Sequence, residues 1–233
     1  MANKKFCVIG LGYFGLNLSL RLAEAGAEVL AIDNQQDKID AIADKVTHAV
    51  CMDTTDIRAL QSFGLQDMDA VIVAIGEGFE SSIMTTAHLQ EIGVKRILNR
   101  VTSPVHERLL KLMSIEELLV PEAEAASHLA HRLMIPGIIE SFEITQDYSI
   151  FEIEAPKRTT GKTLLDLNLR KEYSLNVVTI KRLKQKRGLL TKGEKEEYDV
   201  IGVPTPDTKI INGDILILFG KEDKLKNFLE ENK

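Results

Sequence analysis

Short apolar runs alternate with amphipathic segments along the first half of the chain. Several runs are apolar at successive positions rather than at every second one. This pattern is typical of strands covered on both faces, as in a parallel sheet. The six predicted strands lie at 6–10, 29–33, 48–53, 71–76, 96–101 and 117–121.

Amphipathic helices are predicted between these strands. One example is an apolar stripe with the spacing i, i+3, i+4, i+7, which marks one face of a helix. This stripe consists of Ile39, Ile42, Ala43 and Val46. Six strands joined by five helices form two βαβαβ halves, so we predict a Rossmann-like, doubly wound parallel α/β sheet.

A further helix is predicted over 122–134. Its apolar stripe consists of Ala126, Leu129, Ala130 and Leu133. Pro136 and Gly137 end it, because proline disfavours helical conformation in the residue before it. We therefore expect the first domain to cover 1–135.

The pattern changes in the second half of the chain. Positions alternate between apolar and charged over 149–155, as in a strand with one solvated face. The later predicted elements are a helix (162–171), a strand (175–181), a basic turn (181–188), a strand (214–219) and a short helix with Leu225, Phe228 and Leu229. We predict a small α+β domain over 138–222 and a C-terminal helix over 223–233.

Composition narrows the possible functions. The 29 basic and 35 acidic residues give a net charge of −6, which disfavours nucleic acid as a partner because phosphate backbones bind basic surfaces. No run approaches the roughly 20 apolar residues of a membrane span. The N-terminal apolar stretch holds glycines and polar residues, which favour a strand, turn and helix over a signal peptide. We expect a cytoplasmic protein whose Cys7 and Cys51 are reduced, buried core thiols.

The strongest chemical signal is Gly10-x-Gly12-x-x-Gly15, which follows one predicted strand and opens a helix. Asp33 ends the next strand, 18 residues beyond Gly15 and close to the spacing of about 20 seen in dinucleotide-binding folds. Gly10 permits a tight turn, Gly12 lets the backbone approach a pyrophosphate, and Gly15 allows close helix packing. Asp33 can accept from ribose hydroxyls and would repel a 2′-phosphate. The alternative is a turn that serves packing alone.

Two more loops follow strands at the edge where such sheets bind ligands. Asp53 and Thr54 can reach an adenine edge, or one of them can be the N-cap of a helix at Ile57.

The other wall of the crevice is predicted from the later strands. Gly76 and Glu77 follow the fourth strand. Arg100 ends the fifth and can meet phosphates or form a surface ion pair. Glu122 can cap a helix or hold a cation near the phosphates.

Catalytic and metal sites find little support. Glu124, His128 and His131 share a helix face that can bind a metal, but such a face is more often simply solvated. No histidine follows His131, so the second domain offers no imidazole to act beside a nicotinamide. A nucleotide site without evident catalytic groups favours a sensor in which the ligand shifts a conformational equilibrium.

These motifs resemble the RCK (KTN) domain family, the KtrA and TrkA type of regulatory subunit of Ktr and Trk potassium uptake systems. The segments that carry the resemblance are 6–15, 29–33, 71–94, 118–122, 161–170 and 213–220. The resemblance implies a non-enzymatic subunit attached peripherally to the inner face of the cell membrane through a potassium-translocating partner of the KtrB/TrkH type. It also implies a homodimer, assembled into an octameric ring, in which exchange of ATP, ADP or NAD(H) gates potassium flow. The helix after Glu122 matches the family's dimerising crossover helix.

The resemblance also implies two sets of binding residues. The adenine nucleotide site comprises Gly10, Gly12, Tyr13, Phe14, Gly15, Asp33, Asn34, Asp53, Thr54, Gly76, Glu77, Arg100 and Glu122. A cyclic di-AMP site in the C-terminal domain comprises Leu164, Leu165, Arg170, Asn176 and Val177. Many ATP-responsive relatives carry arginine where this chain has Tyr13, so we expect weak discrimination of ATP from ADP unless Arg100 or a basic residue of a neighbouring subunit takes that role.

Two rival functions remain open. One is a small NAD-dependent oxidoreductase, which turnover of a nicotinamide cofactor with a small substrate would favour. The other is a redox- or ligand-responsive protein that docks on a different target.

Overall fold

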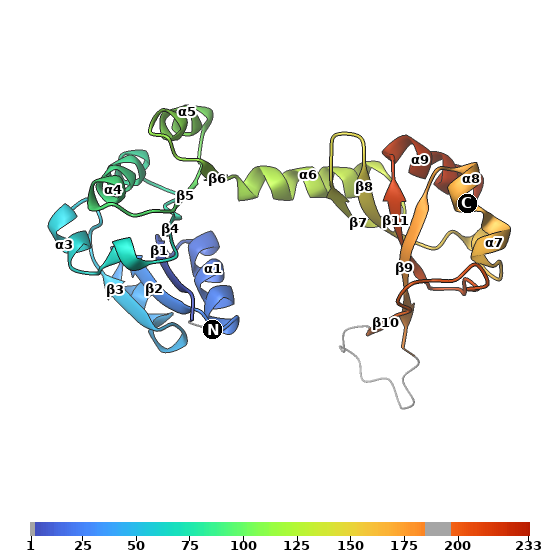
Figure 1. Cartoon of the computed structure of the whole chain (residues 1–233), viewed down its shortest axis with the longest axis horizontal. Helices are drawn as coiled ribbons and strands as arrows, with labels where there is room; N and C mark the ends of the chain where they lie inside the picture. Colours follow the sequence, from blue (N-terminus) through green and yellow to red (C-terminus); the bar gives the residue numbers. More distant parts are fainter. Residues whose placement is uncertain (1–2, 185–196) are drawn as a thin grey trace. The chain divides into compact units, whose positions relative to one another are not determined.

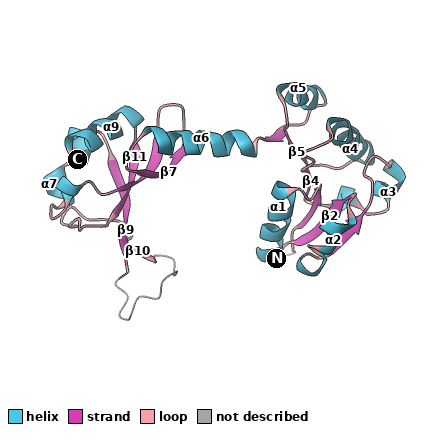
Figure 2. Cartoon of the chain, turned by 180° about the vertical axis from the view of Figure 1, so that it is seen from behind, coloured by secondary structure: helices cyan, strands magenta, loops and turns pink. Residues whose placement is uncertain are grey.

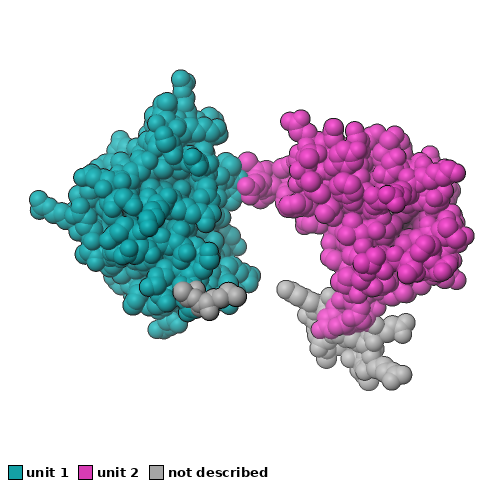
Figure 3. Space-filling view, viewed as in Figure 1, with its two compact units in different colours: residues 1–121 teal, residues 122–233 magenta. Residues whose placement is uncertain are grey.

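The computed structural model describes residues 3–184 and 197–233. By its contacts the chain divides into two compact units, 1–121 and 122–233 (Figure 3). This division lies at the start of the helix predicted over 122–134, whereas the predicted domain boundary lies after that helix. Among the described residues, no helix is both long and apolar enough to cross a membrane.

The first unit is built on a six-stranded parallel sheet in the order β3-β2-β1-β4-β5-β6 (Figure 1). Its strands are β1 (Lys5–Ile9), β2 (Glu28–Asp33), β3 (His48–Cys51), β4 (Ala70–Val73), β5 (Ile97–Arg100) and β6 (Glu117–Leu119). Successive strands are added on one side of β1 up to β3, and then on its other side from β4 to β6. The loops that follow β1 and β4 therefore lead to helices on opposite faces of the sheet. Ligands bind at such a switch point in this type of fold. The predicted doubly wound architecture is confirmed.

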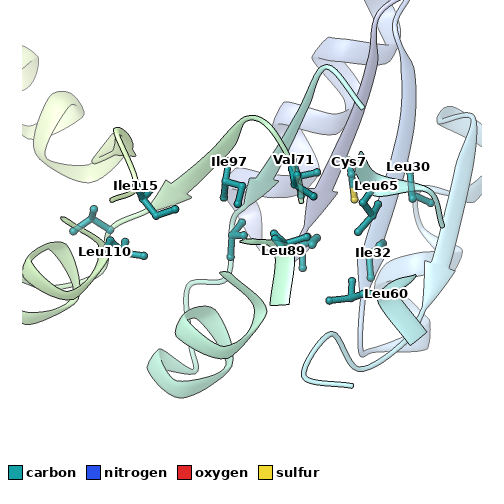
Figure 4. Close-up of a cluster of buried hydrophobic side chains, with 14 residues drawn as sticks. Cys7, Leu30, Ile32, Leu60, Leu65, Val71, Leu89, Ile97, Leu110 and Ile115 are labelled. Carbon is teal, nitrogen blue, oxygen red and sulfur yellow. The ribbon is translucent and has the colours of Figure 1, made fainter. Parts of the chain in front are cut away.

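Helices cover both faces of this sheet (Figure 2). They are α1 (Tyr13–Glu24), α2 (Gln36–Asp40), α3 (Ile57–Gln61), α4 (Phe79–Ile92) and α5 (Pro104–Leu112), with single turns η1 (Ala43–Lys45) and η2 (Leu65–Asp67). The larger core lies on the face of α3, α4 and α5, where Leu60, Leu89 and Leu110 pack against strand residues such as Cys7 (Figure 4). The opposite face packs against α1.

Two details of the first unit correct the sequence predictions. The stripe at 39–46 is not one helix: α2 ends at Asp40, and Ala43 is exposed at the start of η1. Cys51 is exposed rather than buried, because β3 is an edge strand that is not covered on both sides. Cys7 is buried in β1 as expected, and burial raises the pKa of its thiol well above the ordinary value.

The second unit has a five-stranded antiparallel sheet in the order β10-β9-β11-β8-β7. Its strands are β7 (Ile138–Glu143), β8 (Ser149–Glu154), β9 (Asn176–Leu183), β10 (Tyr198–Val200) and β11 (Ile215–Gly220). Its helices are α6 (Pro121–Met134), α7 (Leu164–Leu167), α8 (Leu169–Glu172) and α9 (Glu222–Glu231), with the turn η3 (Lys157–Thr159). Leu225, Phe228 and Leu229 of α9 are buried in its core.

The second unit differs from the sequence predictions in two respects. β7 and β10 were not predicted. The helix expected over 162–171 is two short helices, because Asn168 adopts a left-handed conformation with φ +44° between them. Of the basic turn at 181–188, residues 185–188 lie outside the described part of the chain.

Candidate functional site

The turn between β1 and α1 contains three glycines under different constraints. Gly10 has φ +95°, a left-handed conformation in which a side chain is strained. A Cβ atom on Gly15 would overlap the carbonyl oxygen of Gly10. Gly12 has φ −64°, and no heavy atom beyond its chain neighbours lies within 4 Å of the place its Cβ would take. The fold therefore does not require glycine at position 12, and the open space suits a ligand that approaches the backbone.

Helix α1 begins at this open position. Gly12 is its N-cap and offers no side chain to the first N–H groups, and no acidic residue stands in the first turn. The first N–H groups of a helix have no partner within it, and they carry a partial positive charge. With the space beside Gly12, this helix N-terminus can hold the oxygens of a phosphate or diphosphate.

Asp33, at the end of β2, is 7% exposed and is bonded to the glycine turn. Its Oδ2 accepts from the Leu11 N–H at 2.7 Å, and its Oδ1 accepts from the Gln35 N–H at 3.0 Å. The carboxylate therefore fixes the turn against β2. Each oxygen can accept more than one hydrogen bond, so the group can also receive ribose hydroxyls. Asn34, the next residue, is exposed.

Lys38 is part of this corner, although the sequence analysis missed it. Its Nζ lies 3.4 Å from Oδ2 of Asp33. The pair places a cation beside the carboxylate that would hold the sugar. The available signal was a basic residue in the short helix that directly follows the acidic end of β2.

Asp53 and Thr54, after β3, are held by local bonds. Oδ1 of Asp53 accepts from the N–H and hydroxyl of Thr55 at 2.9 and 2.7 Å, and these bonds lower the pKa of the Asp53 carboxyl. The hydroxyls of Thr54 and Thr85 of α4 lie 2.7 Å apart. Neither Asp53 nor Thr54 is the N-cap of α3, because Asp56 takes that position.

Arg100 comes together with two other predicted residues. Its Cζ lies 6.0 Å from the centroid of the Phe14 ring. A Cβ atom on Gly76 would lie 2.6 Å from Nη1 of Arg100. The guanidinium therefore lies between the first turn of α1 and the loop after β4.

Three other predicted residues lie on or next to the same loops and helices. The Tyr13 side chain is 89% exposed at the start of α1, and Glu77 is exposed in the loop after β4. Glu122 stands in the first turn of α6, within the second unit.

The residues implied for cyclic di-AMP lie on three neighbouring elements of the second unit. Leu164 and Val177 pack against its core, while Leu165 is 66% exposed. Arg170 and Asn176 are exposed on α8 and β9. The arrangement combines an apolar base with an exposed guanidinium.

The histidines of α6 face separate carboxylates. Nδ1 of His128 lies 3.6 Å from Glu140, and Nε2 of His131 lies 3.9 Å from Glu222. Within the ranges that the structure describes, no three His, Cys, Asp or Glu side chains gather as a metal site.

His106 is a second residue that the sequence analysis missed. It is fully buried at the start of α5, where Nδ1 accepts from the Thr102 N–H at 3.3 Å. The Phe79 ring packs edge-on against it, 5.4 Å between centroids. Burial lowers the pKa of the imidazole, so His106 is neutral near pH 7. It links the start of α4 to the β5–α5 turn.

Comparisons with known proteins fit this architecture. The TrkA-N domain model matches residues 6–121, and the TrkA-C domain model matches 149–232. The chain is 37% identical over 225 residues to the Bacillus subtilis "Ktr system potassium uptake protein C", covering 97% of this chain and 96% of the relative. It is 30% identical over 229 residues to "Ktr system potassium uptake protein A" of the same organism, covering 98% and 97%.

Solved structures share the fold. The crystal structure of the GsuK RCK domain aligns with a TM-score of 0.63 and 15% identity, over 99% of this chain and 48% of that one. Part of the chain also aligns with the NAD(P)-binding domain of an exopolyphosphatase-related protein from Archaeoglobus fulgidus. That match has a TM-score of 0.51 and 23% identity, over 57% of this chain and 98% of that one.

Proposed function

Because the chain belongs to the TrkA-N/TrkA-C (RCK) family, we propose that it is the nucleotide-sensing regulatory subunit of a Ktr-type potassium uptake system. It binds an adenine nucleotide (ATP, ADP or NAD(H)) in the cleft of the first unit. It works without catalysis at the cytoplasmic face of the membrane, bound to a potassium-translocating partner of the KtrB/TrkH type.

The observation that carries this proposal is the space at Gly12. Glycine there is required neither by backbone conformation nor by packing, and a ligand that approaches the N-terminus of α1 explains it. The diphosphate lies on these amides, and the ribose binds Asp33. Arg100 meets the phosphates from the opposite wall, and the adenine lies near Asp53 and Thr54.

Binding changes the cleft walls, and the chain carries that change onward. β5 and β6 form one edge of the sheet, and α6 starts two residues after β6 ends. A ligand that favours one position of Arg100 and β5 therefore acts on the segment that leads into α6. The free energy that couples ligand binding to gating equals the difference between the binding free energies of the ligand in the two states.

Helix α6 supports the proposed homodimer. Leu129, Leu133 and Met134 are 50%, 75% and 78% exposed on this helix. An apolar helix face of this kind is normally covered, and we propose that a second copy covers it, within a ring of dimers. Leu133→Glu is expected to shift the full chain to monomer in sedimentation analysis. The adjacent exposed change Arg132→Glu is the matched control and keeps the dimer.

The nucleotide site is tested with a pair of glycine variants. Gly12→Ala is expected to fold like the wild type and to weaken ATP, ADP and NADH binding at least tenfold in calorimetry, since its methyl group fills the ligand space. The second readout is potassium flux through liposomes that hold the membrane partner. Nucleotide-dependent flux in the wild type and its loss in Gly12→Ala support the proposal. Undiminished binding by Gly12→Ala contradicts it.

Tyr13 bears on which nucleotide is preferred. Its side chain supplies a hydroxyl and a ring but no charge at the phosphate end of the helix, so we propose weak discrimination between ATP and ADP. Tyr13→Arg is expected to increase the ATP preference, while Tyr13→Phe leaves it unchanged. A large ATP preference in the wild type would refute this point alone.

A further inference from the structure

The side chain of Arg100 lies against Phe14 and Gly76, among its other contacts. Its Cζ lies 6.0 Å from the centre of the Phe14 ring, at the limit of the range in which a cation is attracted to an aromatic face. On its other side it lies so close to Gly76 that any side chain there would displace it. Phe14 is thus one of the surfaces that decide where this guanidinium lies.

Phe14 is itself fixed by packing. Its ring joins the apolar cluster of Val8, Ala70, Ile72 and Ala74 on the α1 face of the sheet. A ring held in this way is a rigid platform, unlike the flexible side chain that lies on it. An arginine that is already ordered loses less conformational entropy when it binds an anion.

The position of this platform connects it to phosphate binding. Phe14 is two residues beyond the open Gly12, in the first turn of α1. The turn also lies against the β4 loop, since a Cβ on Gly10 would be 2.9 Å from the Ile75 nitrogen. Arg100 therefore lies where the loop after β1 and the loop after β4 meet, and a planar guanidinium binds phosphate oxygens in a bidentate manner.

We propose that Phe14 is a positioning residue: it holds Arg100 at the phosphate end of the cleft, and so determines how steeply affinity rises with the number of phosphates on the ligand. This inference rests on the proposed function. It assigns Phe14 a role that acts through Arg100 rather than through direct contact with the nucleotide.

Two roles for Phe14 predict different patterns. If the ring only supports the fold, its removal lowers the affinities for AMP, ADP and ATP by a similar factor. If the ring positions Arg100, the reduction in affinity grows with the number of phosphates and disappears once Arg100 is replaced. A double-mutant cycle separates these cases, because residues that act through each other are not additive.

The experiment is calorimetry of the full chain with AMP, ADP and ATP. Phe14→Leu is expected to lower the affinity for ATP about three- to tenfold, the range that a cation–π contact provides. The affinity for AMP should fall less than twofold. Phe14→Tyr retains the ring and restores the wild-type dependence on phosphate number. In the Arg100→Gln background, Phe14→Leu has little further effect on ATP.

Gly76→Ala is an independent way to displace the Arg100 guanidinium. Its methyl group displaces the guanidinium, which is the flexible end of a side chain, so the fold is expected to survive. The variant should reproduce the reduced ATP-to-AMP affinity ratio of Phe14→Leu. Equal losses for all three nucleotides, or additive effects of Phe14→Leu and Arg100→Gln, overturn the inference. A wild type that binds none of the three overturns the proposed function instead.

Discussion

The two units place their sheets in different surroundings. In the first, apolar clusters lie on both faces of a parallel sheet. In the second, the described residues form one apolar cluster beside an antiparallel sheet. A sheet covered on both sides gives successive apolar positions, and its loops collect at one edge to form a ligand cleft. A sheet with one solvated face has strands in which polar residues alternate with apolar ones, and this pattern is harder to recognise in a sequence than a continuous apolar run.

The sharpest contrast between the units concerns a glycine in each. A Cβ on Gly15 would overlap backbone, the carbonyl oxygen of Gly10, whereas a Cβ on Gly220 would meet chiefly the Leu175 side chain at 2.5 Å. Backbone cannot yield as a side chain can. We expect Gly15→Ala to destabilise the first unit by more than about 3 kcal/mol and Gly220→Ala to cost the second about 1–2 kcal/mol.

The measurement is hydrogen exchange of the full chain, resolved by peptide, because it reports the opening free energy of each unit separately. Gly12→Ala is the control within the same turn and is expected to leave exchange unchanged without nucleotide. If Gly15→Ala proves as mild as Gly12→Ala, the close packing of α1 on the turn is contradicted.

A second contrast compares two bidentate ion pairs. In the second unit, Arg182 donates to Asp214 at 2.8 and 2.7 Å, and the Asp214 carboxylate is fully buried. In the first, Arg96 donates to Glu117 at 2.6 and 2.7 Å, but both side chains are largely exposed. The geometry is alike, so burial is the difference.

We expect Asp214→Ala to cost the second unit about 3 kcal/mol, because it removes a buried partner of both Arg182 and the Ile211 N–H. Glu117→Ala is expected to change the first unit far less, since exposed pairs contribute little. Urea unfolding followed by circular dichroism, with exchange to assign the unit, checks both. Comparable losses would show that burial does not govern these pairs.

Acid should affect the first unit through His106. Its pKa is lowered by burial, so the unfolded chain binds a proton that the folded chain resists. The contribution of a neutral His106 to the free energy of unfolding is therefore fully present above the pKa of the unfolded chain, about 6.5. Below that pH the free energy of unfolding falls, by at most about 1.4 kcal/mol per pH unit.

The check is unit-resolved exchange at pH 7.5, 6.5 and 5.5, corrected for the intrinsic exchange rate. His106→Gln removes the titrating group and is expected to flatten the acid limb of the first unit. His128→Gln in the second unit, whose side chain is half exposed, is the matched control and leaves it in place. An acid limb that persists in His106→Gln must arise from other groups.

The predictability of the fold follows the same contrast. The doubly wound arrangement of the first unit was predictable because β1, β2 and β4 are apolar at successive positions and glycines mark the turns. β7 and β10 were missed because β7 mixes exposed charge with apolar residues and β10 has only three residues. The helix expected over 162–171 was wrong because Asn168 adopts a left-handed conformation, which asparagine tolerates better than most residues and which the apolar pattern does not reveal.

The cleft was predictable in part for a related reason. Gly10, Gly12, Gly15 and Asp33 occur at fixed spacing within one stretch of sequence. The contacts of Arg100 with Phe14 and Gly76 join three distant segments, so spacing along the chain could not reveal them. Lys38 and His106 were missed because their roles depend on a neighbour's position rather than on a motif.

The smallest expected effect comes from a matched pair of serines. Ser114 in the first unit and Ser174 in the second have φ +60° and +55°, and both are exposed. A residue with a Cβ in the left-handed conformation costs roughly 1–2 kcal/mol. Glycine removes this strain, but its greater conformational freedom in the unfolded chain offsets part of the gain. Ser114→Gly and Ser174→Gly should each stabilise their own unit by about 0.5 kcal/mol, as measured by exchange. Because the strain is local, neither variant should change the other unit, and a gain that appears in both would mean that the two units unfold together.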